Sequence, residues 1–273
     1  RGRLPSPDGA FTHRLMATPL ALRVFESEAR VYRRTWRASV FSSFLNPVLY
    51  LAAMGVGLGS LVDANLPEGV EGVSYLTFLA PGLLVATAMQ TGAGEGAWKV
   101  MAGIKWLKTY HARLATPISI PGLVYGHLLW SGTRVLMVSV VFAVVIAAFR
   151  IAPLWQSLLA VGPALLVGLG MAAVTTAFTA RLKDEAGLPL YFRLVVIPMF
   201  LFSGAFFPIT QLPGFLQAVA LATPMYHGVE LSRAIVVGTE PPIAWWISVL
   251  YLTAWIVAGT ALSLGPFRER LTP

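Results

Sequence analysis

Apolar and charged residues are segregated along most of the chain, so that long stretches without a charged residue alternate with short charged segments. A helix needs about 20 mainly apolar residues to cross the hydrocarbon core of a bilayer. Four uncharged stretches are long enough for one crossing each, and a fifth apolar stretch has Arg134 as its one internal charge. The predicted spans therefore lie within residues 38–62, 72–94, 128–149, 151–180 and 241–267.

A further uncharged stretch, residues 194–229, is too long for one crossing and is interrupted by Pro208, Pro213 and Pro224. Proline removes a backbone donor and disfavours helix in the residue before it. We expect a span over 194–207 that stops at Pro208, then a new helix that starts near Pro213 and stops at Pro224. Residues 208–224 are thus expected to form a re-entrant hairpin in the outer leaflet. An amphipathic helix lying on the outer membrane surface is the alternative.

The five stretches and the span over 194–207 together predict an all-α membrane protein with six transmembrane helices, and composition supports the membrane class. Apolar residues make up 56% of the 273 residues, and charged residues make up only 12%. Soluble domains usually have about a quarter charged residues. A lipid-embedded chain is therefore the expected class.

The net charge of +8 follows from where the basic residues lie. Lys and Arg gather before the first span, between the second and third, after the fourth and at the C-terminus, and cytoplasmic loops retain such residues. Both termini are therefore expected in the cytoplasm, and the charge does not indicate nucleic-acid binding. The expected organisation is a basic tail (1–19), an interfacial amphipathic helix (20–38), a transmembrane domain (39–268) and a cytoplasmic tail (269–273).

Two segments outside the spans have amphipathic patterns. Residues 20–38 alternate apolar side chains with arginines, which predicts a helix at the membrane surface. Its basic face either binds anionic lipid headgroups or only fixes the topology. In the cytoplasmic loop 97–117, Met101, Ile104, Leu107 and His111 recur at helical spacing, which predicts a short amphipathic helix. The positive-inside bias alone also explains the lysines of this loop.

Charge and glycine positions within the spans leave several roles open. Arg134 either snorkels to the inner headgroups, pairs with Glu95 or lies near the headgroup of a cargo. The pairs Gly55–Gly59 and Gly92–Gly96 have the GxxxG spacing that allows close helix packing in lipid. Transmembrane helices also tolerate glycine without such a role.

Candidate chemistry is sparse. The segment 92–99, GAGEGAWK, lacks the Gly-Lys-Ser/Thr ending of a phosphate-binding loop, so any ATPase must be another chain, which would carry ATP and Mg²⁺. Cysteine is absent and the four histidines are scattered, so we expect no catalytic centre and no metal site. Coupling to protons or sodium usually needs acids within the spans. A secondary transporter, or a membrane scaffold without an ATPase, is therefore the weaker alternative.

Three segments carry a family resemblance: YLAAMGVGLGSLV (50–62), GVSYLTFLAPGLLVATAM (72–89) and FLFSGAFFPITQLPGFLQAVALATPMYHGVELSRAI (200–235). From about Val24 to the C-terminus, the chain resembles type-2 ABC transporter permeases of the NodJ lipo-oligosaccharide exporter and DrrB drug-resistance exporter type. The resemblance implies a permease subunit in the cytoplasmic membrane of a bacterium. Such a subunit pairs with a second copy or a related permease, is powered by a separate ATPase, and exports a glycolipid, lipo-oligosaccharide or hydrophobic drug.

The resemblance also implies roles for particular residues. The loop 97–117 becomes a coupling helix, and the helix over 20–38 also meets the ATPase. We expect contacts with that ATPase from Trp106, Thr109, Tyr110 and Arg113. Spans one and five would line the substrate pathway, with candidate contacts at Phe41, Phe44, Tyr50, Met199, Phe200, Phe202, Phe206 and Phe207, although each of these side chains could equally face lipid.

The hairpin is expected to close the external end of this pathway. His227, Glu230 and Arg233 recur every three residues, so they share one helix face, on which Glu230 and Arg233 can pair. The expected external gate, with a polar rim, comprises Pro208, Pro213, Tyr226, His227, Glu230 and Arg233.

Overall fold

The computed structural model describes residues 20–66 and 68–271, and the regular structure of these residues is helical apart from one isolated bridge between Val70 and Val73. The elements of the first half are α2 (Leu20–Leu51), η1 (Ala52–Gly59), α3 (Ser60–Asn65), α4 (Tyr75–Gly94), η2 (Glu95–Lys99), η3 (Ala102–Trp106), α5 (Thr109–Leu114) and α6 (Ile120–Ala148). The elements of the second half are α7 (Leu154–Leu159), α8 (Val161–Arg181), α9 (Gly187–Tyr191), η4 (Phe192–Val196), α10 (Ile197–Phe202), η5 (Ile209–Gln211), α11 (Gly214–Leu221), α12 (Pro224–Val237) and α13 (Trp245–Leu271). Segments η1 to η4 are π-helical, and η5 is a 3₁₀ turn.

Five helical segments within the described residues are long and apolar enough to cross a membrane. They agree with five of the six predicted spans, those drawn from residues 38–62, 72–94, 128–149, 151–180 and 241–267. The segments are Pro47–Asn65, Tyr75–Trp106, Ile120–Ala148, Leu154–Arg181 and Trp245–Leu271. The chain is therefore a multi-pass membrane protein.

The prediction for the remaining span, 194–207, was wrong in its limits. The apolar helix found there is Gly187–Phe202. At 1.5 Å per residue it is about 24 Å long, which is shorter than a hydrocarbon core of about 30 Å. This helix ends before Pro208 because Gly204 has a φ of +83°, a left-handed conformation that glycine adopts at little cost.

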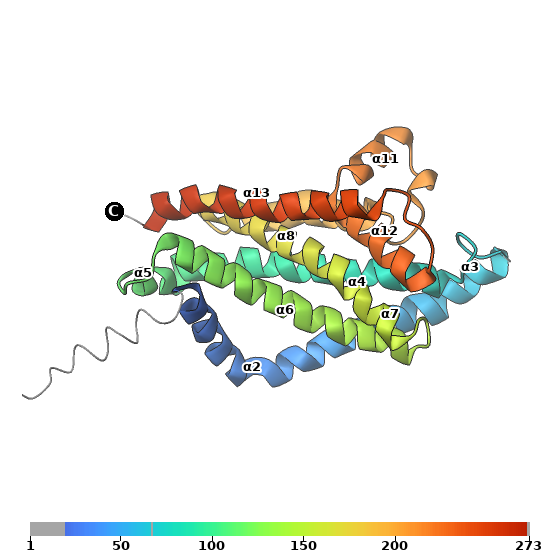
Figure 1. The fold of residues 1–273 in the computed structure, drawn as a ribbon, viewed down its shortest axis with the longest axis horizontal. Coiled ribbons are helices and arrows are strands. Elements are labelled where there is room, and N and C mark those ends of the chain that lie inside the picture. Colours follow the sequence, from blue (N-terminus) through green and yellow to red (C-terminus); the bar gives the residue numbers. More distant parts are fainter. Residues whose placement is uncertain (1–19, 67, 272–273) are drawn as a thin grey trace, which may run out of the picture.

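The prolines of the hairpin act as helix starts. Pro213 directly precedes α11, as expected, and Thr223 caps α12 by accepting a hydrogen bond from the Tyr226 backbone N–H. Pro224 is the first residue of α12, where its missing N–H costs nothing. The expected end at Pro224 is therefore also the start of a second limb, which packs against α4 and α8. The first limb, α11, stands out from the bundle (Figure 1).

The core is centred on α8, which packs against α4, α6, α12 and α13. A Cβ atom added to Gly92 would lie only 1.9 Å from the Gly168 carbonyl oxygen, and one added to Gly96 would lie 2.6 Å from that of Ala172. The backbones of α4, η2 and α8 are therefore in contact. This confirms the close packing predicted from the Gly92–Gly96 spacing.

The predicted interfacial helix continues without a break into the first span: α2 contains the segment 20–38 and the start of the span Pro47–Asn65, which goes on through η1 and α3. Residues 20–46 contain no glycine or proline that would end a helix, and α2 bends without breaking (Figure 1). Its start packs on α6, where a Cβ added to Gly126 would lie 2.5 Å from the Ala21 carbonyl oxygen. The ends at Leu20 and Leu271 lie with α5 at one end of the bundle, the α5 end; α3, α7 and α11 lie at the opposite end (Figure 1).

Candidate functional site

The loop between the second and third spans ends in an exposed tip. The expected single helix is broken, because Lys108 adopts a left-handed conformation (φ +50°) between η3 and α5. Leu107, which was expected on the apolar face of an amphipathic helix, is 72% exposed. We call the exposed residues Lys105, Trp106, Leu107, Lys108 and Thr109 the α5 tip. Left-handed backbone in a non-glycine residue costs about 1–2 kcal/mol, so the surrounding contacts must hold this bend.

Tyr110 and Arg113, which were predicted to contact a partner, face inward. Tyr110 is 2% exposed and packs against Phe267 of α13 and against Gly103, whose added Cβ would lie 2.7 Å from the tyrosine ring. Its hydroxyl lies 3.5 Å from His127 Nδ1. Burial raises the pKa of the Tyr110 hydroxyl, so it stays neutral. The prediction of direct contact is thus wrong for Tyr110, whereas Trp106 and Thr109 are exposed as expected.

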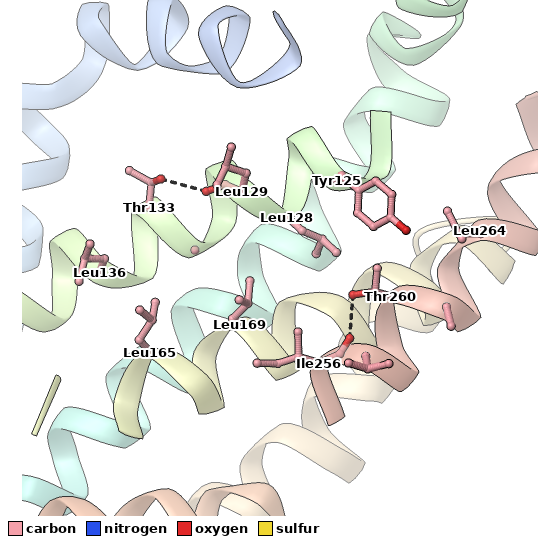
Figure 2. Close-up of a pocket in the computed structure, with 13 residues that line it drawn as sticks. Tyr125, Leu128, Leu129, Thr133, Leu136, Leu165, Leu169, Ile256, Thr260 and Leu264 are labelled. Carbon is pink, nitrogen blue, oxygen red and sulfur yellow. Dashed lines mark hydrogen bonds between the residues drawn. The ribbon is translucent and has the colours of Figure 1, made fainter. Parts of the chain in front are cut away.

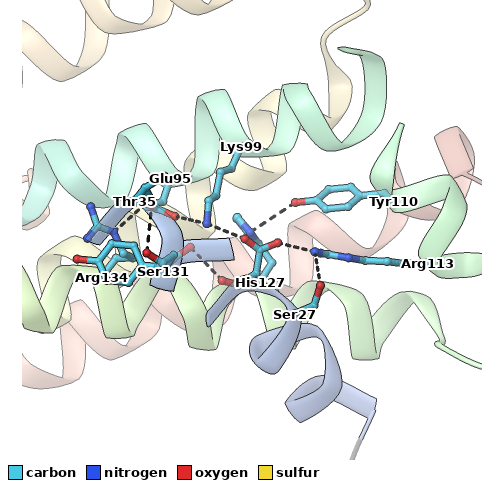
Figure 3. A network of polar contacts seen from close by, with 11 residues as sticks. Ser27, Thr35, Glu95, Lys99, Tyr110, Arg113, His127, Ser131 and Arg134 are labelled. Atoms are coloured by element: carbon cyan, nitrogen blue, oxygen red, sulfur yellow. Dashed lines mark hydrogen bonds and ion pairs between the residues drawn. The ribbon is translucent and has the colours of Figure 1, made fainter. Parts of the chain in front are cut away.

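Behind the α5 tip lies a network of charges, the α2–α6 network, formed by Glu28, Glu95, Lys99, Arg113 and Arg134 (Figure 3). Glu28 accepts hydrogen bonds from Lys99 Nζ and Arg113 Nη2, both at 2.7 Å. Glu95 lies 3.4 Å from Lys99 Nζ and 3.4 Å from Arg134 Nε. The network therefore joins α2, η2, α6 and the segment that carries the α5 tip.

The network has two further consequences. Of the three roles left open for Arg134, the structure shows the ion pair with Glu95, and the guanidinium also lies 4.6 Å from the Tyr32 ring centroid. Burial alone would raise the pKa of Glu28, but the charges and hydrogen bonds of Lys99 and Arg113 outweigh it and lower that pKa. Glu28 is thus ionised at neutral pH.

The opposite end of the bundle holds a buried ion pair. Arg233 pairs with Glu230 as predicted, donates a 2.7 Å hydrogen bond to the Gly204 carbonyl oxygen, and lies 3.8 Å from the Phe78 ring centroid. It thereby joins α12 to α4 and to the bend after α10. His227 points elsewhere, since its ring nitrogens lie 3.0 Å from Ser248 Oγ and 3.1 Å from the Leu221 carbonyl oxygen.

This arrangement corrects the expected polar rim. Tyr226, His227 and Arg233 are buried and Glu230 is half-buried, so these side chains fasten the hairpin to the bundle. Pro208 and Pro213 are placed as corners, one directly before η5 and one directly before α11.

The aromatic residues predicted along a pathway fall into two groups. Those on α2 are exposed: Phe41, Phe44 and Tyr50. Those on α10 and the bend after it are half-buried: Met199, Phe200, Phe202, Phe206 and Phe207. In the second group, the Phe200 and Phe206 rings pack edge to face at 4.9 Å.

A groove beside this second group contains a polar residue that the sequence analysis missed. It has a volume of about 410 Å³ and lies between α4, η2, η4 and α10; we call it the α4–α10 groove, lined by Gln90, Gly94, Trp98, Phe192, Val196, Ile197, Phe200 and Leu201. Gln90 is exposed within an apolar span, and polar residues in spans usually face a cavity or a partner. Its amide carries no charge, so the positions of the charged residues did not reveal it.

The role of Glu28 was also not predicted from the sequence. It is an acidic residue among the arginines of 20–38, and its partners are distant in sequence. Within the described ranges, no group of three or more His, Cys, Asp or Glu residues could hold a metal ion.

Comparisons with known proteins agree with the sequence resemblance. Residues 21–237 match the family described as ABC-2 type transporter. The chain is 30% identical to nodulation protein J of Rhizobium meliloti (strain 1021) over 92% of its own length and 94% of that protein. It is 32% identical to nodulation protein J of Rhizobium leguminosarum bv. trifolii over 88% of its length and 92% of that protein. It is 28% identical to the protein of that name from Bradyrhizobium diazoefficiens, over 88% and 89% of the two chains.

Proposed function

Because the chain belongs to the ABC-2 type transporter family, we propose that it is the membrane permease subunit of an ATP-driven exporter. Its ATPase is a separate chain that binds ATP and Mg²⁺. We place the assembly in the cytoplasmic membrane of a bacterium, in keeping with the rhizobial relatives. Both termini and the α5 end then face the cytoplasm, an orientation supported by the basic residues of the loop that contains α5.

The observation that carries this proposal is the α5 tip. Trp106 and Leu107 are large apolar side chains at the end of the bundle, and 47% and 72% of their respective surfaces are exposed. Tyr110 is buried directly behind them, and Arg113 is tied to Glu28. An exposed aromatic anchor on a fixed support is typical of a protein docking surface. We infer that the tip enters a groove on the ATPase and transmits its movement to α2 and α6 through the network.

A substrate route is proposed along the α4–α10 groove. In a dimer with a second copy or a related permease, exposed Phe41, Phe44 and Tyr50 of one subunit would face the groove of its mate. Aromatic walls with one amide, Gln90, suit an amphipathic molecule. The sequence resemblance favours a glycolipid or lipo-oligosaccharide, with a hydrophobic drug as the second cargo class. The α11–α12 hairpin would then close the external end.

The test is purification of the tagged full chain in mild detergent with the candidate ATPase co-expressed. We expect an ATPase with a GxxxxGK[ST] loop to remain bound, and its ATP hydrolysis to rise with one cargo class, glycolipid or drug. Stimulation by one class identifies the substrate. A stable permease dimer that binds no ATPase would contradict the proposal and favour a secondary transporter or a membrane scaffold.

A further inference from the structure

A second groove lies on the outside of the bundle, between α6, α8 and α13 (Figure 2). We call it the α6–α13 groove. It is separate from the α4–α10 groove, which is the proposed substrate route. Its volume is about 730 Å³. Leu129, Leu136, Leu165, Leu169 and Val257 contribute to its walls.

The walls of this groove offer little to a polar ligand. Besides Tyr125, the hydroxyl groups in its lining belong to Thr133 and Thr260. Thr133 Oγ1 donates to the Leu129 carbonyl oxygen at 2.9 Å, and Thr260 Oγ1 donates to that of Ile256 at 2.7 Å. Both hydroxyls are therefore satisfied within their own helices, and the groove suits an apolar chain.

The length of the groove is close to the thickness of one leaflet. Its α6 wall runs from Tyr125 to Leu136, a length of about 16 Å at the helical rise of 1.5 Å per residue. Half of a typical hydrocarbon core is about 15 Å. Tyr125 and Leu264 mark one end of the groove, and Leu136 and Leu165 mark the other (Figure 2). Because Tyr125 lies near the start of α6, the first of these ends is at the α5 end of the bundle.

That end of the groove carries polar and positively charged groups. Tyr125 is half exposed, and tyrosine favours the membrane–water interface. Arg268 is exposed and follows Leu264 by four residues on α13, so it lies one helical turn beyond the groove on the same face. A cationic side chain at this depth attracts the phosphate of anionic lipids.

We propose that the α6–α13 groove binds an acyl chain of an anionic phospholipid from the leaflet at the α5 end, with the phosphate beside Tyr125 and Arg268. The bound lipid would brace α6 against α13. Its occupant belongs to the membrane and is distinct from the exported cargo. The site is independent of the ATPase and can be tested without it.

The test uses the full chain in lipid nanodiscs of phosphatidylcholine that contain a trace of phosphatidylglycerol with a photoactivatable acyl chain. Peptide mass spectrometry should place adducts on α6 and α13 at least fivefold above those on exposed Leu190 and Leu194, which lie outside both grooves. A phosphatidylcholine probe should label the groove several-fold less. Evenly spread adducts, equal labelling by both probes, or a cross-link to a second copy at this face would overturn the proposal.

A substitution that fills the groove can be compared with a matched substitution outside its lining. A Cβ added to Gly132 would have Leu169 Cδ1 as its nearest neighbour at 3.5 Å, so Gly132→Leu fits and occupies the groove. Gly265→Leu, on α13 but outside the lining, meets nothing within 4 Å. We expect Gly132→Leu to lower groove labelling at least fivefold and Gly265→Leu to leave it unchanged. Ala261→Phe fills the groove from α13 and replaces Gly132→Leu if that variant does not fold. Unchanged labelling in the folded filling variant overturns the site.

The headgroup contact has its own variant. Arg268→Gln should remove the preference for phosphatidylglycerol over phosphatidylcholine while labelling of the groove persists. A preference that survives this change would overturn the assignment of the phosphate to Arg268.

Discussion

Lys99 Nζ lies 2.7 Å from Glu28 Oε2, although the two residues are 71 positions apart in the sequence. The contact ties α2 to the end of the second span. Because the same carboxylate also binds Arg113, α2 and the α5 tip share one anchoring residue. The two ion pairs of Glu28 therefore join α2 both to η2 and to the segment that carries the α5 tip.

Glu28→Gln should destabilise the permease. The change leaves Lys99 and Arg113 beside a neutral amide in a site where the Glu28 side chain is only 13% exposed. The loss should be about 2 kcal/mol, below the value for a fully buried pair because Lys99 is partly solvated. Thermal unfolding of the purified protein measures it. The control is Glu26→Gln, since Glu26 is exposed and lies 3.9 Å from Arg30; an equal loss in this control would contradict the prediction.

Acidification should abolish the difference between wild type and Glu28→Gln. The pKa of Glu28 is lowered from its usual value of 4.5, so its stabilisation is present above that value and is lost as pH falls through the folded-state pKa. The gap in unfolding temperature should stay constant from pH 7 to about 5 and should narrow below pH 4.5. A gap that widens in acid would contradict the lowered pKa.

Trp106→Ala should weaken ATPase binding without unfolding the chain. Removing an aromatic anchor from an interface commonly costs about 2 kcal/mol or more, and each 1.4 kcal/mol is about tenfold in affinity. A binding titration with the purified ATPase should therefore show at least a tenfold rise in Kd. Trp155→Ala, on α7 at the opposite end, replaces another exposed tryptophan and should leave Kd unchanged. Equal losses in both variants would refute docking at the tip.

Gly204→Ala should disturb the hairpin. Gly204 has a φ of +83°, and an added Cβ would lie 3.1 Å from Ile209 Cγ2. The left-handed conformation alone should cost about 1–2 kcal/mol, and the Gly204 carbonyl that accepts from Arg233 would shift. Lower unfolding temperature and reduced export are expected. Gly214→Ala, where a Cβ meets nothing within 4 Å, should change neither; export at the wild-type rate in Gly204→Ala would argue against the gate.

Much of the fold could be predicted because membrane helices are set by local composition. Four uncharged stretches and one apolar stretch with a single charge, Arg134, located five spans, and the Glu230–Arg233 pair followed from helical spacing alone. The errors have local causes that residue types do not reveal. The left-handed Gly204 ended the helix before Pro208, and Lys108 broke a segment whose periodicity indicated one helix.

The candidate site was harder to predict. Trp106 and Thr109 were exposed as expected, but periodicity could not show that Tyr110 turns inward onto Phe267. The pair of Glu28 and Lys99 depends on how α2 packs against the bundle, and no spacing within the sequence encodes that contact.

If this chain forms the pathway of an ATP-driven exporter, movement of its cargo must depend on the ATPase. The most direct measurement reconstitutes the permease and its ATPase in proteoliposomes and follows a fluorescent glycolipid moving between leaflets. We predict movement that requires ATP, stops when the ATPase phosphate-loop lysine is replaced, and falls at least tenfold with Trp106→Ala. Movement that proceeds without ATP, or that follows an imposed proton or sodium gradient, would contradict an ATP-driven mechanism.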